Sequence, residues 1–463
     1  MGAISEWIKQ HNIEDIECLV PGINGNAFGK LVHADKLINK EDIRLPEAVL
    51  LQSVTGGYPE EFEDILGVAD SDMFLKPDPS AISPVPWAKK PTAQVIHDCY
   101  TREGKLHPLS SRGVLKRVIE LFENEGWRPV VAPEIEFYLI HQCFDSRSKL
   151  QPATGRSGRA EKMRKSYTIE AIKEFDSLVE EVFLYCASMG LDADSIVDES
   201  GAAQMEVNFL HGDALSLADQ VFSFKRMLQE TAMKHGIFAT FMAKPMELQP
   251  GSSIHVHQSI IGSEDGKNIF VDEQGHENKL FRHYIGGLQK FTNAVMAFYA
   301  PNANSYRRFR KGSAAPINVD WGYDNRTVGI RVPDGSAESK RVENRFAGVD
   351  SNPYLVMAAT LTCGYLGMKM AIEPAAPFSG SSYDEEMSLP RSLEQAMRLL
   401  SESQELREVF GDTFVDAFIA VKGFENEEFN NAMGIIPRLS SVIFPQSNRL
   451  ISPWEREYLL LNV

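Results

Sequence analysis

Apolar residues recur at helical spacing in some stretches of the chain and alternate with polar residues in others. In residues 112–126 the apolar side chains, among them Val114, Val118 and Phe122, fall on one stripe and Gly126 follows, which predicts an amphipathic helix. The next segment, 127–140, is rich in β-branched and aromatic residues and predicts a strand. The same reasoning predicts helices over 168–189, 214–236, 353–372, 391–403 and 413–421, and short strands flanking the second of these between 196 and 260.

Three stretches without helical periodicity indicate how the chain is organised. The first hundred residues mix short β-type runs with Gly and Pro breaks, residues 76–92 are dense in proline and predict a segment between elements, and residues 144–167 predict a long surface loop. Because helices and strands do not alternate regularly, an α+β fold is expected rather than a doubly wound parallel sheet. We place a domain boundary near residues 103–109, which gives domains 1–105 and 106–463.

The most apolar long stretch, Pro353–Ile372, is interrupted by Gly364 and Lys369. A transmembrane span is possible on length alone, but a buried helix with an Asn352 cap is the favoured interpretation. The first fifteen residues carry acids and no apolar core, which is not typical of a signal peptide, and Glu6 breaks the myristoylation pattern. We therefore expect a cytoplasmic protein without a membrane partner.

Composition narrows the class further. A chain of 463 residues is longer than one compact domain usually is, and its net charge of −17, with no Lys/Arg run, argues against a nucleic-acid partner. The acid excess fits either solubility or a carboxylate cluster that binds cations. The cysteines are odd in number and lack CxxC spacing, which argues against a disulfide framework and a cysteine zinc site. They are Cys18, Cys99, Cys143, Cys186 and Cys363.

Carboxylates and imidazoles gather on the predicted strands. Glu134 and Glu136 are two apart in PEIEF, so both side chains point to the same face. Taken alone, such a pair is better explained by the solvent-facing edge of an amphipathic strand. His255, His257 and Ser259 alternate in the same way within GSSIHVHQS. A single histidine in such a strand is more often a core residue. Two histidines at strand spacing after a Gly/Ser loop make a role in binding metal or phosphate about as well supported as a core role.

Two further motifs add charges of both signs. In KRVENRF, Arg341, Glu343 and Arg345 share one face of a predicted strand. A structural ladder of ion pairs often has the same pattern, so this motif alone is not specific to a binding site. Glu199 and Glu206 lie seven residues apart in DESGAAQMEV. They are candidates for the same site, and the alternative is that they are two unrelated acids on the surface. Further arginines that suit anionic oxygens are Arg307, Arg308, Arg310 and Arg331.

Together these motifs supply five carboxylates and two imidazoles on strand-like segments, accompanied by arginines. That inventory suits Mg²⁺ or Mn²⁺ bridging to a phosphate rather than tetrahedral zinc. The chain has no GxxxxGK[ST] motif and no GxGxxG spacing, so metals and arginines must do the work of a phosphate loop if a nucleotide is bound.

The order and spacing of these motifs resemble the type I-like branch of the glutamine synthetase superfamily over nearly the whole chain. The motifs that carry the resemblance are PEIEF, ESGAAQMEV, KPMELQPGSSIHVHQS, NSYRRF, DNRTVGIRVP and RVENRFAGVDSNPYL. The resemblance implies a small β-grasp-like N-terminal domain and a larger α+β catalytic domain built on an antiparallel sheet. It also implies a homo-oligomer, either a six-subunit ring or a double-ring dodecamer, with active sites between neighbours.

By matching position, the resemblance implies two divalent metals, ATP as co-substrate and glutamate activated as an acyl phosphate. The first metal would be held by Glu136, Glu199 and Glu206, and the second by Glu134, His255 and Glu343. Residues that match the ATP contacts of the family are His257, Ser259, Arg331 and Arg341. Gly251 falls in the loop that holds the amino-acid substrate, and Arg308, Arg326 and Arg345 match arginines that grip its carboxylate or the transferred phosphoryl group.

The chain departs from the ammonia-using members of the family at two acidic positions that bind ammonium and help to deprotonate it. Ala314 and Leu51 stand where those members have Glu and Asp. A pocket without these acids is roomier and less polar, which implies a larger primary amine as nucleophile, as in the γ-glutamylputrescine and γ-glutamylpolyamine synthetases. Pro250 and Ala203 are two further departures, and the first bears on glutamate recognition.

Three functions therefore stay open. A glutamate–amine ligase leads, an ammonia-using glutamine synthetase comes second, and a catalytically silent ring protein comes third because a silent protein has no need for costly buried carboxylates. The amine itself is not specified by the sequence. Glu60, Glu61 and Glu63 are candidates for binding a second ammonium of a diamine; if they face solvent, an apolar monoamine is the better substrate.

Overall fold

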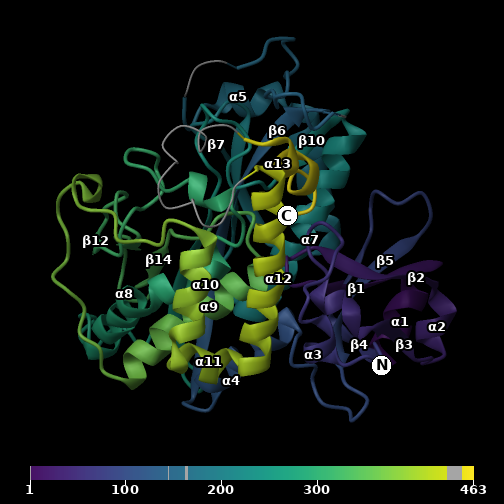
Figure 1. Cartoon of the computed structure of the whole chain (residues 1–463), viewed down its shortest axis with the longest axis horizontal. Coiled ribbons are helices and arrows are strands. Elements are labelled where there is room, and N and C mark those ends of the chain that lie inside the picture. The colour runs from purple at the N-terminus through teal and green to yellow at the C-terminus, as the bar shows by residue number, and fades with distance from the viewer. Residues whose placement is uncertain (1, 144, 162–164, 435–450) are drawn as a thin grey trace.

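The computed structural model describes residues 2–143, 145–161, 165–434 and 451–463 (Figure 1). The described α-helices are α1 (Gly2–Gln10), α2 (Ala34–Ile38), α3 (Phe62–Leu66), α4 (Ser111–Glu123), α5 (Ile169–Glu174), α6 (Asp176–Met189), α7 (Ala214–Lys234), α8 (Lys279–Tyr299), α9 (Pro353–Lys369), α10 (Leu393–Glu402), α11 (Gln404–Phe410), α12 (Asp412–Ala432) and α13 (Pro453–Tyr458). Short 3-10 helices are η1 (Glu47–Leu51), η2 (Ser305–Arg307) and η3 (Ser382–Asp384).

The described strands form two sheets, one from each part of the chain. Those of the first sheet are β1 (Asp15–Pro21), β2 (Ala27–His33), β3 (Ile43–Pro46), β4 (Asp72–Pro84) and β5 (Thr92–Tyr100). Those of the second are β6 (Trp127–His141), β7 (Ala193–Asp198), β8 (Gln204–Phe209), β9 (Gly212–Asp213), β10 (Ile237–Thr240), β11 (Ile254–Gly262), β12 (Trp321–Tyr323), β13 (Ile330–Val332) and β14 (Val342–Asn344). The described strand pairs are mostly antiparallel, and helices and strands do not alternate regularly along the chain, so the predicted α+β class is confirmed.

The first sheet has the order β2-β1-β5-β4-β3 and lies with α1 and α2 at the lower right of Figure 1. Its central pair, β1 and β5, is parallel, and the other pairs are antiparallel. All five strands end before residue 101, whereas the second sheet begins at Trp127. The division into domains 1–105 and 106–463 is compatible with this arrangement and stays a prediction.

The second sheet positions the motif residues. It has the order β12-β13-β14-β11-β6-β8-β7, and its described pairs are antiparallel apart from β12 with β13. The long strand β6 lies in the middle, and α4 and α7 contact it. Between the two glutamates, Ile135 on β6 points to the opposite face and is fully buried. One face of the sheet is therefore packed as core, and the other is free to carry polar groups.

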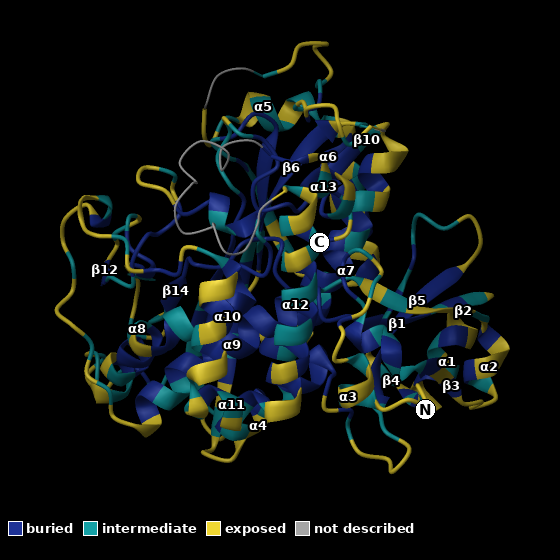
Figure 2. Cartoon of the chain, viewed as in Figure 1, coloured by how far each residue is buried: buried dark blue, intermediate teal, exposed yellow. Residues whose placement is uncertain are grey.

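The stretch Pro353–Ile372 folds as a buried helix rather than as an isolated span. In α9 every residue from Pro353 to Gly364 is buried, and the Asn352 side chain caps the helix by accepting from the backbone amides of Tyr354 and Leu355. The helix packs against α4, α7 and α8, and this region is dark blue in Figure 2. Among the described residues, no helix combines the length and apolarity needed to cross a membrane.

The predictions for helices at 112–126 and 214–236 and for the strand at 127–140 are confirmed by α4, α7 and β6. The prediction for residues 76–92 is wrong in part, because β4 continues through the prolines to Pro84. β3 pairs with β4 only as far as Leu75, so the later prolines sit on an unpaired edge, and the register shifts between Pro77 and Ile82. Proline is tolerated at such an edge because its missing N–H has no ladder partner there.

Two other segments refine the predicted elements. The helix predicted at 413–421 extends to Ala432, because the buried Val421, Glu425 and Phe429 continue its inner stripe through a charged stretch. In the predicted loop 144–167, the described residues form only isolated bridges, of which one joins Ile140 to Pro152. Phe144 and residues 162–164 lie outside the described residues.

A buried arginine joins the first sheet to helices α4 and α7, which pack against the second sheet. Arg112, at the start of α4, donates to Asp219 of α7 through Nε at 2.9 Å and through Nη2 at 2.8 Å. It also donates to Asp78 of β4 and Asp98 of β5, and it is fully buried. A charge this deep is tolerated only because three carboxylates compensate it.

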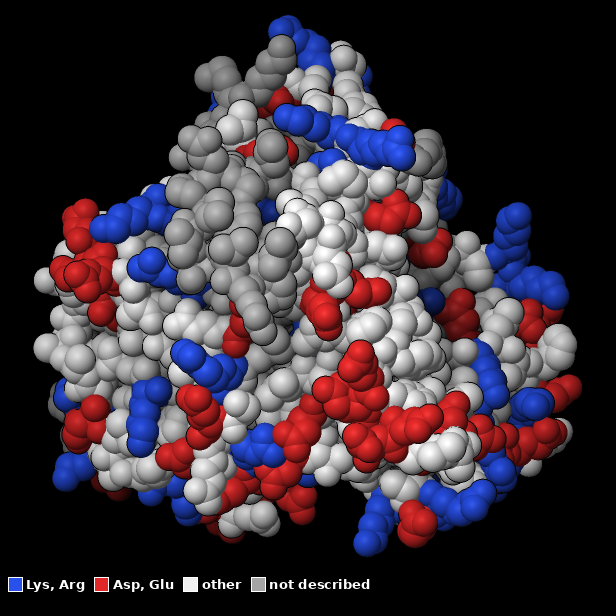
Figure 3. All heavy atoms as spheres, in the orientation of Figure 1, with Lys and Arg blue, Asp and Glu red and all other residues white. Residues whose placement is uncertain are grey.

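The net negative charge of the chain is visible on its surface. On the face drawn in Figure 3, Asp and Glu side chains form a band across the lower half of the molecule.

Candidate active site

The register of the second sheet brings the separate motifs together. His255 on β11 lies opposite Glu134 on β6, and Glu136 lies opposite Glu206 on β8. Farther along β11, His257 lies opposite Glu343 on β14. Residues that are directly paired across antiparallel strands point to the same face, so the acids and imidazoles of four strands face one side of the sheet.

This face forms the floor of a cavity of about 790 Å³. Fourteen of the residues singled out from the sequence line it: Glu134, Glu136, Glu199, Glu206, Pro250, Gly251, His255, His257, Arg308, Ala314, Arg326, Arg331, Arg341 and Arg345. Glu343 is buried directly beneath and contacts Arg331 and Arg345. Among the described residues, the lining does not include Ser259, which is one strand repeat beyond His257 and pairs with Val130.

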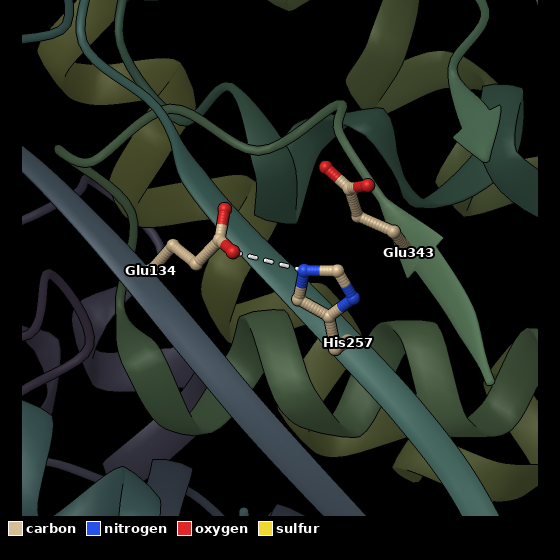
Figure 4. Close-up of side chains that lie close together, drawn as sticks. All are labelled: Glu134, His257 and Glu343. Atoms are coloured by element: carbon tan, nitrogen blue, oxygen red, sulfur yellow. Dashed lines mark hydrogen bonds and ion pairs between the residues drawn. The ribbon is translucent and has the colours of Figure 1, made fainter. Parts of the chain in front are cut away.

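Glu134 lies at the centre of two groups of metal-ligand type. Its Oε1 is 2.9 Å from His257 Nε2, and its Oε2 is 3.3 Å from His255 Nδ1. Atoms of Glu134, His257 and Glu343 lie within 4.8 Å of one another (Figure 4). Atoms of Glu134, Glu206 and His255 also lie within 4.8 Å of one another. These groups share four residues with the two metal sets that the resemblance implies, but they divide them differently, and Glu136 and Glu199 line the same cavity beside them.

The protonation of the carboxylates follows from their surroundings. Burial and the charge of Glu199 raise the pKa of Glu136 to about 8. Burial and the neighbouring charges, that of Glu134 first, raise the pKa of Glu206 to about 10. At Glu134 the hydrogen bonds with the two histidines outweigh burial and hold its pKa well below the usual range. Crowded carboxyl groups whose mutual repulsion opposes ionisation form a donor set that fits divalent cations.

Arginines line the part of the cavity next to Glu343. Arg331 donates to Glu343 at 2.8 Å, and Arg345 also donates to Glu343. Burial raises the pKa of Glu343, but the charges of Arg345, His257 and His255 outweigh it and lower the pKa to about 2. The Nε atoms of Arg331 and Arg345 are buried and lack a hydrogen-bond partner among the described residues. Unpaired guanidinium N–H groups beside a carboxylate cluster fit phosphate or carboxylate oxygens as ligands.

Further arginines occupy different depths of the cavity. Arg308 is buried and donates to Phe346 O at 3.1 Å and to Ser253 Oγ at 2.6 Å. Arg341 reaches His257 Nδ1 at 3.3 Å, and Arg326 is exposed. The cavity thus carries positive charge from its floor to its rim.

The backbone beside the sheet is fitted closely to Arg308. A Cβ atom at Gly251 would lie 2.5 Å from Cγ of Arg308 and 2.9 Å from the carbonyl oxygen of Ala243. Only glycine fits this approach, because real Cβ atoms do not come so near to other heavy atoms. The loop that contains Pro250 therefore passes directly over the arginine.

Gln204 is a site residue that the sequence argument missed. It is buried, and its Nε2 donates to Glu136 Oε2 at 3.3 Å, Gly251 O at 3.0 Å and Ser252 Oγ at 3.1 Å. It thereby ties the Gly251 loop to a carboxylate of the floor. Its position two residues before Glu206 on a strand was the signal that could have found it.

Tyr167 and Tyr383 also line the cavity and were not predicted. Tyr167 has a left-handed backbone (φ 60°) at the end of a polar segment, and Tyr383 lies in the short helix η3. Neither segment has a periodic pattern, so the sequence carried no signal for them.

Comparison with known proteins assigns the chain to a family. A model of the catalytic domain of glutamine synthetase matches residues 108–436. The chain belongs to the glutamine synthetase family. A glutamate–isopropylamine ligase from a Pseudomonas species is 33% identical over 442 residues, which cover 92% of this chain and 95% of that protein. A glutamine synthetase from Pyrococcus woesei is 31% identical over 442 residues, covering 93% and 95%.

The fold agrees with this assignment. A solved structure of GmaS in complex with ADP superimposes with a TM-score of 0.81 at 24% sequence identity and covers 99% of each chain. The glutamine-synthetase-type fold and the recognised family are thus confirmed, and the protein is an ATP-dependent ligase. The names of the two relatives imply different nitrogen substrates. Because the chain is about equally identical in sequence to both proteins, the comparison leaves its own substrate open.

Proposed function

We propose that this protein joins the γ-carboxylate of glutamate to a primary amine at the expense of ATP. In the first step a γ-carboxylate oxygen of glutamate attacks the γ-phosphorus of ATP, which forms γ-glutamyl phosphate and releases ADP. In the second step the amine nitrogen attacks the acyl carbon, phosphate leaves, and the nitrogen loses a proton. A carboxylate is a poor electrophile, and this sequence of steps makes it reactive.

The carboxylates and imidazoles of the floor would hold two divalent cations, Mg²⁺ or Mn²⁺. The ligands implied are Glu134, Glu136, Glu199, Glu206, His255 and Glu343, with His257 close enough to Glu134 and Glu343 to join them. When bound, such cations supply charge neutralisation and Lewis-acid activation of the phosphoryl group.

The arginines would do the positioning that phosphoryl transfer requires. Arg331 and Arg341 lie near His257 and are assigned to the phosphates of ATP. The resemblance implies the same role for Ser259, but this residue is not in the described lining of the cavity, which weakens its assignment. The buried Arg308, beside Gly251, is assigned to a carboxylate of glutamate. Arg345, with its unpaired Nε, and Arg326 are assigned to the transferred phosphoryl group. Fixed guanidinium groups stabilise charge that develops on transferred oxygens.

The observation that carries the choice of an organic amine is Ala314. This residue lines the cavity where ammonia-using relatives have a glutamate, and its backbone is left-handed (φ 66°). A methyl group offers an ammonium ion neither charge nor a hydrogen bond, and it leaves room for the carbon chain of a larger amine. An amine with pKa near ~10 must lose a proton before attack.

The exposure of the N-terminal acids favours a monoamine. Glu60, Glu61 and Glu63 are exposed and do not belong to the described lining of the cavity. Leu51 is fully buried in the core of the first sheet, so its side chain supplies no polar group to any site. Without a fixed acid for a second ammonium, an apolar monoamine is a better substrate than a diamine.

The ammonia-using glutamine synthetase is the second candidate, because a relative of that name is 31% identical over almost the whole chain. A catalytically silent ring protein is less well supported, because the cavity keeps crowded carboxylates that destabilise a protein without a ligand to neutralise them. We also propose a cytoplasmic homo-oligomer, a six-subunit ring or a double ring, as the resemblance implies.

The test is phosphate release from ATP with Mg²⁺ or Mn²⁺, glutamate and a panel of ammonia, isopropylamine and other alkyl amines, ethanolamine, putrescine and spermidine. Turnover with a monoamine well above that with ammonia supports the proposal, and mass spectrometry of the γ-glutamylamide identifies the product. Preference for ammonia would establish the second candidate. A lack of turnover with every amine would favour the silent protein.

A further inference from the structure

A buried carboxylate that does not line the cavity lies directly behind Arg308. Asp350 is 1% exposed and follows β14 in the segment that leads to α9. Its Oδ2 accepts from Asn302 Nδ2 at 2.8 Å and from Ser305 Oγ at 2.6 Å. Its Oδ1 is buried without a hydrogen-bond partner among the described residues. An unpaired buried carboxylate oxygen is costly unless a positive charge compensates it.

The direction in which that oxygen faces can be read at Gly348. A Cβ atom built there would lie 2.4 Å from Asp350 Oδ1 and 3.3 Å from Arg308 Nη1. The unpaired carboxylate oxygen and the guanidinium therefore border the same small space, which only a glycine leaves open. Neither Gly348 nor Asp350 belongs to the described lining of the cavity.

The polar groups around Asp350 fix its orientation. Asn302 Oδ1 accepts from the buried Lys422 Nζ at 3.4 Å, so the amide NH₂ of Asn302 must face Asp350. Ser305 Oγ accepts from the backbone N–H of Asn302 at 3.1 Å, which leaves its own hydrogen for Asp350. The other hydrogen bonds of Asn302 and Ser305 thus fix both groups as donors to Asp350 Oδ2. With Oδ2 held in this way, Oδ1 faces Arg308.

Arg308 requires such a partner. Burial lowers the pKa of its guanidinium, and the charges of Glu136 and Asp350 are the two that oppose this effect. In the proposed function Glu136 binds a metal cation, which takes up its charge. Asp350 is then the carboxylate that remains to hold Arg308 charged and in place.

We propose that Asp350 is a positioning residue that orients Arg308 for the carboxylate of the amino-acid substrate without touching that substrate. The proposal rests on the proposed function, since it takes Arg308 as the group that binds glutamate. Asp350 acts through electrostatic attraction from behind, and Asn302 and Ser305 hold it there.

The test compares D350N with D219N in full-length protein. Asp219 is a matched control, because it is also buried and also accepts from a hydroxyl, that of Tyr354, but the arginine beside it, Arg112, does not line the cavity. D350N keeps the shape and removes the charge. We expect its KM for glutamate to rise by about tenfold or more, with KM for ATP changed less than about twofold. D219N is expected to lower the melting temperature and leave both KM values unchanged.

S305A provides a milder test, which is used if D350N does not fold. It removes one of the two donors to Asp350, and its KM for glutamate is expected to rise by less than that of D350N, with the same selectivity. An unchanged glutamate KM in the folded variants, or an equal rise of both KM values, would overturn the positioning role. Failure of the proposed function is distinguishable, because the wild-type enzyme itself would then not turn over glutamate with any amine.

Discussion

Glu136 and Glu206 lie directly opposite each other on the neighbouring strands β6 and β8, and both line the same cavity. Burial and like charge raise the pKa of the first to about 8 and of the second to about 10. Two such groups can ionise together only when positive charge is supplied to them. This pair therefore couples the stability of the protein to both pH and divalent metals.

The first prediction concerns stability without metal. An acid whose pKa is higher in the folded than in the unfolded state contributes stability that is complete below the unfolded value, about 4.3, and is lost as pH rises through the folded value. In the presence of EDTA, the melting temperature should therefore fall as pH rises from about 6 to about 9. Addition of Mg²⁺ or Mn²⁺ should raise it, and the increase should be larger at the higher pH because fewer protons must be displaced.

E206Q is the variant that checks this interpretation. It removes one of the repelling charges, so it should weaken both the fall with pH and the metal-dependent rise, as measured by differential scanning fluorimetry with and without EDTA. A wild-type melting temperature that is independent of metal between these pH values would contradict the assignment of the pair to a cation.

The second prediction concerns Ala314. A314E is expected to increase kcat/KM for ammonia and to decrease it for the best organic amine, because a carboxylate there supplies charge for ammonium and fills space. The left-handed backbone at this position costs any residue with a Cβ atom about 1 kcal/mol, and Ala314 already bears this cost. Expression and melting are measured in parallel. A314G is the control: glycine suits this backbone, and it adds no acid, so ammonia use should not increase. If A314E gains no activity with ammonia, our placement of the amine site is wrong.

The third prediction concerns Arg326, which is exposed within the cavity. If it stabilises the transferred phosphoryl group, R326A should lower kcat by on the order of 10²-fold, with a smaller effect on KM for ATP. R391A, at an exposed arginine outside the cavity, is the control and should behave as the wild type. Equal rates in R326A and the wild type would remove Arg326 from the mechanism. Steady-state phosphate release measures both variants.

The fourth prediction concerns the junction between the sheets. R112M removes the guanidinium that compensates the buried Asp78, Asp98 and Asp219, and breaking a buried ion pair in this way costs about 3–5 kcal/mol of folding free energy. R407A removes a half-buried arginine that pairs with the exposed Asp412 and Asp416, and it should cost less than about 1 kcal/mol. Urea denaturation monitored by circular dichroism compares the two variants. Similar losses in both would show that Arg112 does not hold the sheets together.

Much of the local structure could be predicted from the sequence because it depends on short-range periodicity. The helices α4, α7 and α9 follow from apolar spacing and capping residues within single segments. The alternation of a strand placed Glu134 with Glu136, and His255 with His257, on shared faces before any fold was known. The order of the motifs along the chain indicated the family, and the matching catalytic-domain model confirms it.

The sequence could not indicate which residues meet between segments. The pairing of His257 with Glu343, the central place of Glu134 between both histidines, and the position of Asp350 behind Arg308 depend on strand register and on loops that approach from distant parts of the chain. The same non-local geometry left Ser259 outside the cavity. Periodicity fixes the face on which a residue lies, but the tertiary structure alone decides its partners, because hydrogen-bond register and core packing are set between segments and not within them.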